Sequence, residues 1–231
     1  MAEITIVLGN KTYSSWSLRG WLVLERCGVA FDEIVVPLRR DDSRAAILEH
    51  SPSGKVPTLI LRDGATEQAV WDSLAIAETL AERFPAAGLW PEEPNARALA
   101  RSVTAEMHAG FQALRRNLPM DLRGGLAGEA ERLRAAEGVA ADVDRIVAIW
   151  GHCRSHTVAR GGDFLFGGFG AADAAFAPVA SRLATYGVPL SGAAADYAAA
   201  LLDWPAFKRW SEAARAEPWT IDFPELAAPS R

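Results

Sequence analysis

The strongest constraint on the fold is that strand-like patterns are confined to the first third of this chain. β-Branched and apolar runs alternate there with helical spacing, and they stop before Pro85–Pro94, a stretch with three prolines and a glycine. Such a stretch is typical of a linker. Alanine- and arginine-rich segments with helical spacing follow it. The pattern therefore predicts a mixed α/β part followed by an all-helical part.

The first part alternates short strands and helices. The expected strands are Ile4–Leu8, Phe31–Leu38, Pro57–Arg62 and a return strand through Ala69-Val70 after the Asp63-Gly64 turn, and the expected helices are Ser15–Cys27, Ser43–His50 and Ser73–Phe84. A helical crossover places the first two strands parallel to each other. The order βαβαββα is that of a thioredoxin-like domain, which we expect over residues 1–85.

The second part is expected to be an all-α helical bundle over residues 96–231, joined to the first by a linker over residues 86–95. Its helical patterns cover Ala96–Leu118, Glu129–Arg160, Ala171–Tyr186, Ala193–Leu202 and Pro205–Ala216, with a glycine-rich loop at Gly161–Gly170. Alanine-rich helices pack closely, which suits a bundle of about five.

Composition excludes several classes of protein. The net charge of -5 and a pI near 5.5 leave no basic stripe for nucleic acid. Two cysteines, Cys27 and Cys153, form no disulfide framework or C-x-x-C redox motif. His152 and His156 stand four apart on one helix face, but no glutamate completes H-E-x-x-H, so no metal site is expected. Without a leader or a membrane-length apolar run, we expect a cytoplasmic protein that binds no membrane.

Two adjacent serines mark the entry to the first expected helix. Ser14 and Ser15 follow the strand Ile4–Leu8 and precede an apolar helical pattern. Their hydroxyls and the unpaired N–H groups of a helix start converge on one spot, which favours negative charge. Such a spot can hold a thiolate. The alternative is that both serines only cap the helix.

Taken in order, the chain's motifs resemble those of the glutathione transferase superfamily over nearly the whole length. SSWSLR at Ser14–Arg19 is similar to the SSCSWR signature of the zeta class, with Trp16 in the cysteine's place. SPSGKVPTL at Ser51–Leu59 resembles the loop that leads into the family's cis-proline, and WDSLAI at Trp71–Ile76 resembles its acidic-residue-plus-serine pair. A weaker likeness lies in FGGFGAADAAFAP at Phe166–Pro178, which is similar to the family's capping-box helix.

The resemblance implies that glutathione is the co-substrate and that a serine stabilises its thiolate. The catalytic role falls on Ser14 first and Ser15 second, with Tyr13 as a minor candidate because other classes use tyrosine. Only the anion is a competent nucleophile, and lowering a thiol pKa of ~8.5 by about two units takes roughly 3 kcal/mol. A serine hydroxyl and a helix N-terminus can supply that much together.

The same resemblance assigns the remaining glutathione contacts. Val56 pairs through its backbone with the cysteinyl unit before a cis Pro57, and Lys55 reaches the glycyl carboxylate. Asp72 meets the glutamyl ammonium, and Ser73 meets the glutamyl carboxylate at a helix start. The alternatives are that Pro57 simply begins a strand and that Asp72-Ser73 is a plain helix cap.

The acceptor pocket is assigned less directly. Its candidate residues are Trp16, Met107, His108, Phe111, Arg115 and Tyr186. Arg115 or Arg182 can meet an anionic group, and the arginine that binds substrate in zeta-type isomerases has Thr185 in its place here. Aromatic residues at helical spacing are also ordinary core residues. Asp173, three residues after Gly170, is expected to cap a helix and to have no catalytic role.

The leading expectation is a cytoplasmic, homodimeric glutathione transferase that attacks an electrophilic apolar substrate. Alternatives are a glutathione-dependent cis–trans isomerase of the maleylacetoacetate type, a peroxidase, and a non-catalytic binding module with the same fold. The intact serines and the Asp72-Ser73 pair argue against the last alternative.

Overall fold

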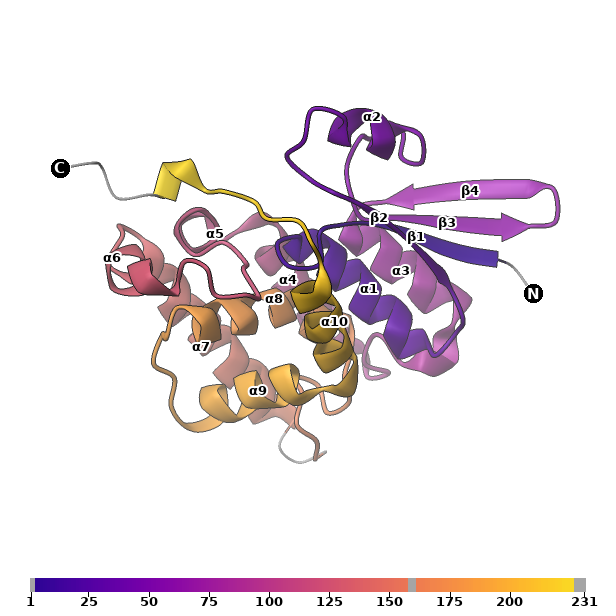
Figure 1. The fold of residues 1–231 in the computed structure, drawn as a ribbon. Helices are drawn as coiled ribbons and strands as arrows, with labels where there is room; N and C mark the ends of the chain where they lie inside the picture. Colours follow the sequence, from indigo (N-terminus) through magenta and orange to yellow (C-terminus); the bar gives the residue numbers. More distant parts are fainter. Residues whose placement is uncertain (1–2, 158–160, 227–231) are drawn as a thin grey trace.

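The computed structural model describes residues 3–157 and 161–226, and it has the two parts that the sequence indicates (Figure 1). A sheet with its helices, coloured indigo to magenta, lies beside a group of helices coloured rose to orange. Residues 158–160, at the end of the expected helix Glu129–Arg160, lie outside the described residues, as do both chain ends.

The first part contains a four-stranded sheet with strand order β2-β1-β3-β4. The strands are β1 (Glu3–Gly9), β2 (Asp32–Val36), β3 (Thr58–Asp63) and β4 (Thr66–Trp71). β1 runs parallel to β2, which confirms the crossover argument, and the other neighbours are antiparallel. In this register Val7 of β1 stands opposite Ile34 on one side and Thr58 on the other.

Helices cover both faces of the sheet. They are α1 (Ser15–Cys27), α2 (Ser43–Leu48) and α3 (Ser73–Arg83). Because successive strand residues point to opposite faces, Ile6 and Leu8 join the main core with α1 and α3. Val7, between them, packs with Ile47 of α2 in a separate small core. This part thus has the thioredoxin-like arrangement that its sequence predicts.

The first helix begins and ends where the sequence predicts. The Ser14 side chain accepts a hydrogen bond from the Ser17 backbone N–H at 3.3 Å, which caps the helix start. Gly28 follows the last residue with φ 67, in the left-handed region that glycine adopts most readily. The start of α1 is therefore a fixed point on which a site can be built.

The helices and strands of the second part, within its described residues, are all helices, apart from isolated β-bridges between Phe164 and Gly167 and between Phe166 and Gly168. Its helices are α4 (Pro94–Ala109), α5 (Gln112–Asn117), α6 (Ala130–Arg134), α7 (Val139–Thr157), α8 (Ala171–Thr185), α9 (Gly192–Asp203) and α10 (Pro205–Ala216), with short 3-10 turns at Pro85–Ala87, Ala127–Glu129 and Pro224–Leu226. The first of these turns overlaps the start of the expected linker. None of the described helices is both long and apolar enough to cross a membrane.

Two segments that the sequence predicts as single helices are each broken into shorter helices in the structure, so both predictions are wrong in this respect. Ala96–Leu118 is broken at Gly110 and Phe111, and Phe111 has φ 62, a backbone conformation that interrupts the helical hydrogen bonds between α4 and α5. Glu129–Arg160 is broken before α7 at Gly138, which has φ 80. A Cβ at Gly138 would lie 3.0 Å from the Ala113 Cβ, so this break also lets α5 approach closely.

The two parts share one hydrophobic core. Helix α1 packs against α3 in its own part and against α8 and α10 in the other. Helix α8 is buried along almost its whole length, and it also contacts α4 and α9. The start of α1 consequently lies at the junction of the two parts.

Candidate active site

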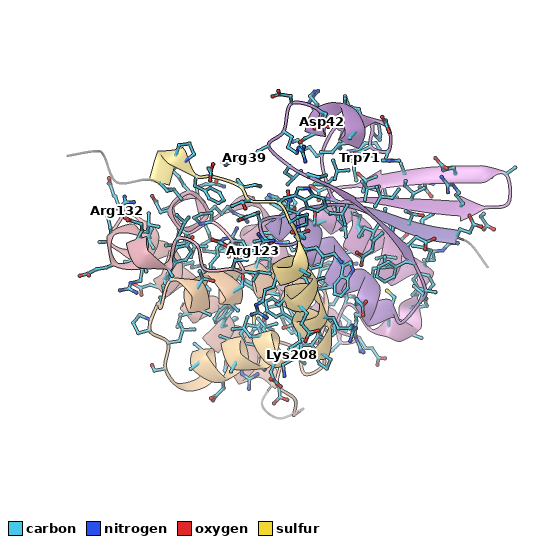
Figure 2. All side chains as sticks on the ribbon, viewed as in Figure 1. Arg39, Asp42, Trp71, Arg123, Arg132 and Lys208 are labelled. Atoms are coloured by element: carbon cyan, nitrogen blue, oxygen red, sulfur yellow. The ribbon has the colours of Figure 1, made fainter. Side chains whose placement is uncertain are left out.

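A cleft of about 710 Å³ opens at this junction, and segments far apart in the sequence line it. They are the start of α1, α2, the loop before β3, the end of β4 with the start of α3, and the end of α4. The lining residues are Trp16, Leu38, Ile47, Ser53, Gly54, Lys55, Val56, Pro57, Trp71, Asp72, Ser73 and His108. Trp71, labelled in Figure 2, stands at the end of β4 on the side of α2 and is 46% exposed.

The loop before β3 presents an open backbone to the cleft. The Val56-Pro57 peptide bond is cis, which confirms the prediction for this loop. Pro57 is buried, Val56 is half-buried and Lys55 is exposed, and all three line the cleft. A Cβ at Gly20 would lie 3.0 Å from the Pro57 Cγ, so the glycine lets α1 pack directly on the proline. The backbone of Val56 is thereby held at the edge of the cleft.

The start of α3 also lines the cleft. The Asp72 carboxylate accepts a hydrogen bond from the Leu74 N–H at 2.8 Å, and Ser73 is the first residue of the helix. Asp72 has φ 75, which is unusual for a residue with a side chain. Its Oδ2 also lies 3.3 Å from Nε2 of His108, on α4. A carboxylate, a hydroxyl and a helix N-terminus thus meet at one end of the cleft.

The two serines at the start of α1 differ in their hydrogen bonds. The Ser14 hydroxyl donates to the Ser17 Oγ at 2.8 Å, and the Ser17 Oγ in turn accepts from the Gly9 N–H at 2.9 Å. Within the described part of the chain, the Ser15 hydroxyl has no such partner. Both serines are 6% exposed, and the residue that lines the cleft at this point is the next one, Trp16.

Trp16 forms part of the wall between the two parts. Its ring lies 5.0 Å from the ring of His108 in an edge-on arrangement. Two guanidinium groups also lie against it, with the Cζ of Arg19 at 4.5 Å and the Cζ of Arg115 at 4.8 Å from the ring centre. The cleft wall at the predicted cysteine position is therefore an aromatic ring flanked by cations.

The loop between β1 and α1 is held in place by the C-terminal end of the described chain. The Glu217 carboxylate accepts hydrogen bonds from the backbone N–H groups of Lys11 and Thr12, at 2.6 and 3.1 Å. Trp210 donates from Nε1 to the Lys11 carbonyl at 2.9 Å. Arg123, labelled in Figure 2 beneath the C-terminal segment, donates to the carbonyls of Ala214, Glu217 and Trp219.

Several predicted pocket residues lie elsewhere. Met107, Phe111 and Tyr186 belong to the hydrophobic core and do not line the cleft. The Tyr186 hydroxyl donates to the Pro119 carbonyl at 2.9 Å. Tyr13 packs against Phe223, and burial raises its pKa, which keeps the phenol protonated.

Asp173 has the structural role that the sequence predicts. Its carboxylate accepts from the N–H groups of Gly170 and Leu165, at 2.8 and 3.1 Å, and from the Tyr197 hydroxyl at 2.9 Å. Gly170 has no side chain, so only the acidic half of a capping box is present. Burial raises the pKa of Asp173 to about 6.

The protein's own thiols are poor candidates for sulfur chemistry. Burial raises the pKa of Cys27 to about 11 and that of Cys153 to about 12, so both stay protonated at neutral pH. The described residues include no group of three histidine, cysteine or acidic side chains that could hold a metal ion. A thiolate at the start of α1 would have to come from a bound molecule.

Sequence reasoning did not assign Arg19, Ser17 or Glu217 to the site. The sequence could have indicated Arg19, because it follows Ser15 by four residues and Trp16 by three and therefore lies on the same helix face. Glu217 had none, since it contacts a loop more than 200 residues earlier in the chain.

The fold and the arrangement around the cleft define the class: the chain has the glutathione transferase fold. Residues 13–83 match the family described as Glutathione S-transferase, N-terminal domain. A glutathione transferase homologue from Burkholderia gl BGR1, solved with bound glutathione, superposes with a TM-score of 0.65 at 22% identity. That likeness covers 92% of this chain and 98% of the other.

Two further relatives share the name maleylacetoacetate isomerase. The enzyme from Anaeromyxobacter dehalogenans 2CP-1, with bound glutathione, has a TM-score of 0.65 at 23% identity and covers 91% of this chain and 96% of its own. A probable maleylacetoacetate isomerase from Caenorhabditis elegans is 31% identical over 131 residues. This match spans 55% of the chain and 58% of that relative.

Proposed function

We propose that the protein is a glutathione transferase, which binds glutathione in the cleft and activates its thiol as a thiolate. The observation that carries this proposal is that the cis Val56-Pro57 loop, the Asp72-Ser73 helix start and Trp16 of α1 line one cleft. The match of residues 13–83 to the transferase family and the relatives solved with bound glutathione support it.

Each part of glutathione has a matching group in the cleft. Ser73 and the N–H groups at the start of α3 suit the glutamyl carboxylate, and Asp72 suits the ammonium beside it. The open backbone of Val56 suits the cysteinyl unit, which would pair with it like a short strand. Lys55, exposed at the same edge, suits the glycyl carboxylate.

In this pose the thiol points toward the start of α1. We assign the hydrogen bond to sulfur to Ser15 before Ser14, because the Ser14 hydroxyl already donates to Ser17 and accepts from its N–H. A hydroxyl donating to an anion contributes about 1.5–3 kcal/mol, and the helix N-terminus adds about 0.3–1 kcal/mol. Together these lower the thiol pKa by about two units.

The chemical step is then nucleophilic attack on an electrophilic carbon. The thiolate sulfur donates its electron pair to that carbon and forms a C–S bond, while the leaving group departs with its bonding pair. Trp16 and His108 form the wall against which an acceptor would lie. The rate enhancement comes from ionisation of the thiol and from holding the two reactants together.

Glutathione-dependent cis–trans isomerisation is a second candidate. It is favoured by the 31% identity to the probable maleylacetoacetate isomerase of Caenorhabditis elegans, and by the SSWSLR motif, which is similar to the zeta class. In that reaction the thiolate adds to a double bond, the bond rotates, and the thiolate leaves again. Turnover of a maleyl compound to its fumaryl isomer, with glutathione unconsumed, would select this candidate.

A cytoplasmic homodimer remains the expected form of the protein. Light scattering that gives the mass of one chain at micromolar concentration would exclude the dimer, and recovery of the native protein outside the cytoplasmic fraction would exclude the location.

Calorimetric titration with glutathione tests the proposed function. We expect the wild-type protein to bind glutathione and Ser73→Ala to bind it at least tenfold more weakly, because a charge-assisted hydrogen bond is lost. Ser102→Ala, at an exposed serine on α4 whose hydroxyl donates to Ala98 O, is the matched control and should bind like wild type. Absence of binding at millimolar glutathione, or equal affinities for wild type and Ser73→Ala, would contradict the proposal.

A further inference from the structure

An arginine in α1 is buried with no hydrogen-bond or ion-pair partner among the described residues, and the Trp16 ring lies against its guanidinium. Arg19 is 2% exposed, and its Nε, Nη1 and Nη2 atoms form no hydrogen bond within the described part of the chain. Burying an unpaired charge costs several kcal/mol. Arginine cannot avoid that cost by losing its proton, because its guanidinium stays ionised in proteins. The position therefore calls for a negative group.

A second buried arginine, Arg182, and the half-buried Arg115 increase the local positive charge. Arg182 of α8 is 4% exposed, and its Nε also has no partner among the described residues. Among the residues that the structure describes, Arg115 donates only to the main-chain carbonyls of Met107, His108 and Gly110 at the end of α4. No carboxylate in the described chain forms an ion pair with any of the three arginines.

The three guanidinium groups act on one another. After burial, the charges of Arg115 and Arg182 are the next causes that lower the pKa of Arg19, and only Asp72 opposes them. Burial and then Arg115 lower the pKa of Arg182 to about 9, so it too remains charged at neutral pH. Arg19 and Arg115 both lie within 4.8 Å of the Trp16 ring centre.

Arg19 also lines a small cavity directly behind the cleft. The cavity of about 10 Å³ is bounded by α1, α3, α4 and α8, with Ser73 and His108 among its lining residues. The same two residues line the cleft itself. The volume suits one water-sized atom, and the remaining walls are mostly alanine and leucine side chains.

We propose that Arg19, with Arg115 and Arg182 around it, forms a buried site for one small monovalent anion. The anionic atom is either a halide ion from solution or a carboxylate oxygen of a molecule bound in the cleft. Both carry a single negative charge, and both can accept hydrogen bonds from the unpaired N–H groups of Arg19. Only the second source rests on the proposed transferase function.

Thermal unfolding in different sodium salts at constant ionic strength tests the anion site without any turnover. With chloride or bromide replacing the larger methanesulfonate, we expect the midpoint of the wild-type protein to rise by about 3–5 °C for each tenfold increase above the dissociation constant. Arg19→Met removes the charge at similar length, and its midpoint should not respond to halide. Arg145→Met, at an exposed arginine paired with Glu106, should respond like wild type.

A second variant and a crystallographic measurement keep the proposal testable if Arg19→Met does not fold. Arg182→Met should weaken the halide response, and crystals of the wild-type protein soaked in bromide should show an anomalous peak beside Arg19. A wild-type midpoint that is the same in halide and methanesulfonate, or an Arg19→Met variant with the full halide response, would overturn the proposal.

Kinetics then distinguish the two sources of the anion. With glutathione present, the rate for 4-chloro-3-nitrobenzoate is compared with that for its methyl ester, each with and without chloride. Competition by chloride against the benzoate alone assigns the site to the carboxylate of an acceptor. A halide-dependent midpoint without such competition assigns it to the free ion. Loss of turnover beside an intact halide response would count against the transferase function and not against the anion site.

Discussion

At the scale of single residues, Asp72 combines a strained backbone with several contacts. Its φ of 75 is one that glycine adopts more readily than any other residue, yet the chain carries an aspartate here. Such strain costs about 1–3 kcal/mol and persists where the side chain is needed. The Asp72 carboxylate caps α3 at the Leu74 N–H and lies beside His108.

Replacing Asp72 separates these two effects. We expect Asp72→Gly to change the free energy of unfolding by less than ~1 kcal/mol, because relief of strain offsets the lost cap. Asp72→Ala loses the cap and keeps the strain, so it should be destabilised by about 1–2 kcal/mol. Urea unfolding measures both, and glutathione affinity should fall in both variants.

Asp42 provides the matched control for this pair. It stands before α2 with an ordinary φ of -88, and its side chain makes no cap hydrogen bond (Figure 2). Asp42→Gly and Asp42→Ala should both change stability by less than ~1 kcal/mol. If Asp72→Gly were destabilised as much as Asp72→Ala, backbone strain at Asp72 would not contribute to the free energy of unfolding.

At the scale of elements, local sequence predicts those helices whose ends carry their own signals. The bounds of α1 and α10 were predicted to the residue, since serine and glycine flank the first and a proline opens the second. The break between α4 and α5 could not be predicted in this way. Two hydrogen bonds stabilise the break. Arg115 donates to a carbonyl at the end of α4, and Asp142 of α7 accepts from the Leu114 N–H at 2.9 Å.

Helix α8 depends on one buried carboxylate at its start. The pKa of Asp173 is raised from its ordinary 3.8 to about 6, so the folded protein holds this proton more tightly than the unfolded chain. The stabilisation is fully present below about pH 4 and is lost as the pH rises through about 6. The difference of about two pH units corresponds to about 3 kcal/mol.

Asp173→Asn should remove this pH dependence. We expect the wild-type protein to lose about 3 kcal/mol relative to the variant between pH 4 and pH 7, measured by urea unfolding at each pH. Asp163→Asn, at an exposed position in the preceding loop, controls for the removal of an acidic residue at this end of α8. A constant difference between wild type and Asp173→Asn across this range would show that Asp173 is not the group responsible.

At the scale of the whole molecule, the site exists only because distant parts of the chain meet. Motifs in the first 85 residues were sufficient to predict the cis-proline loop and the helix start at Ser73. The arginine cluster joins α1, α5 and α8, and the loop before α1 is held by Glu217. Contacts of this kind follow from packing, which local patterns do not encode.

The choice between the two serines also depends on the folded molecule. The motif resemblance places Ser14 first and Ser15 a close second, because Ser14 matches the first serine of the zeta signature. In the structure, Ser14 is committed to Ser17, which in turn receives the Gly9 N–H from the end of β1. The hydrogen-bond network between strand and helix, and not the motif, favours Ser15.

The most direct measurement is a titration of the thiolate absorbance of glutathione bound to the protein. The bound thiol should ionise about two pH units below the ordinary value of ~8.5, and Ser15→Ala should raise that pKa by about one unit or more. Ser14→Ala should act mainly on stability, by about 1 kcal/mol. A bound thiol that ionises as it does in water, or whose pKa is the same in wild type, Ser14→Ala and Ser15→Ala, would contradict the account.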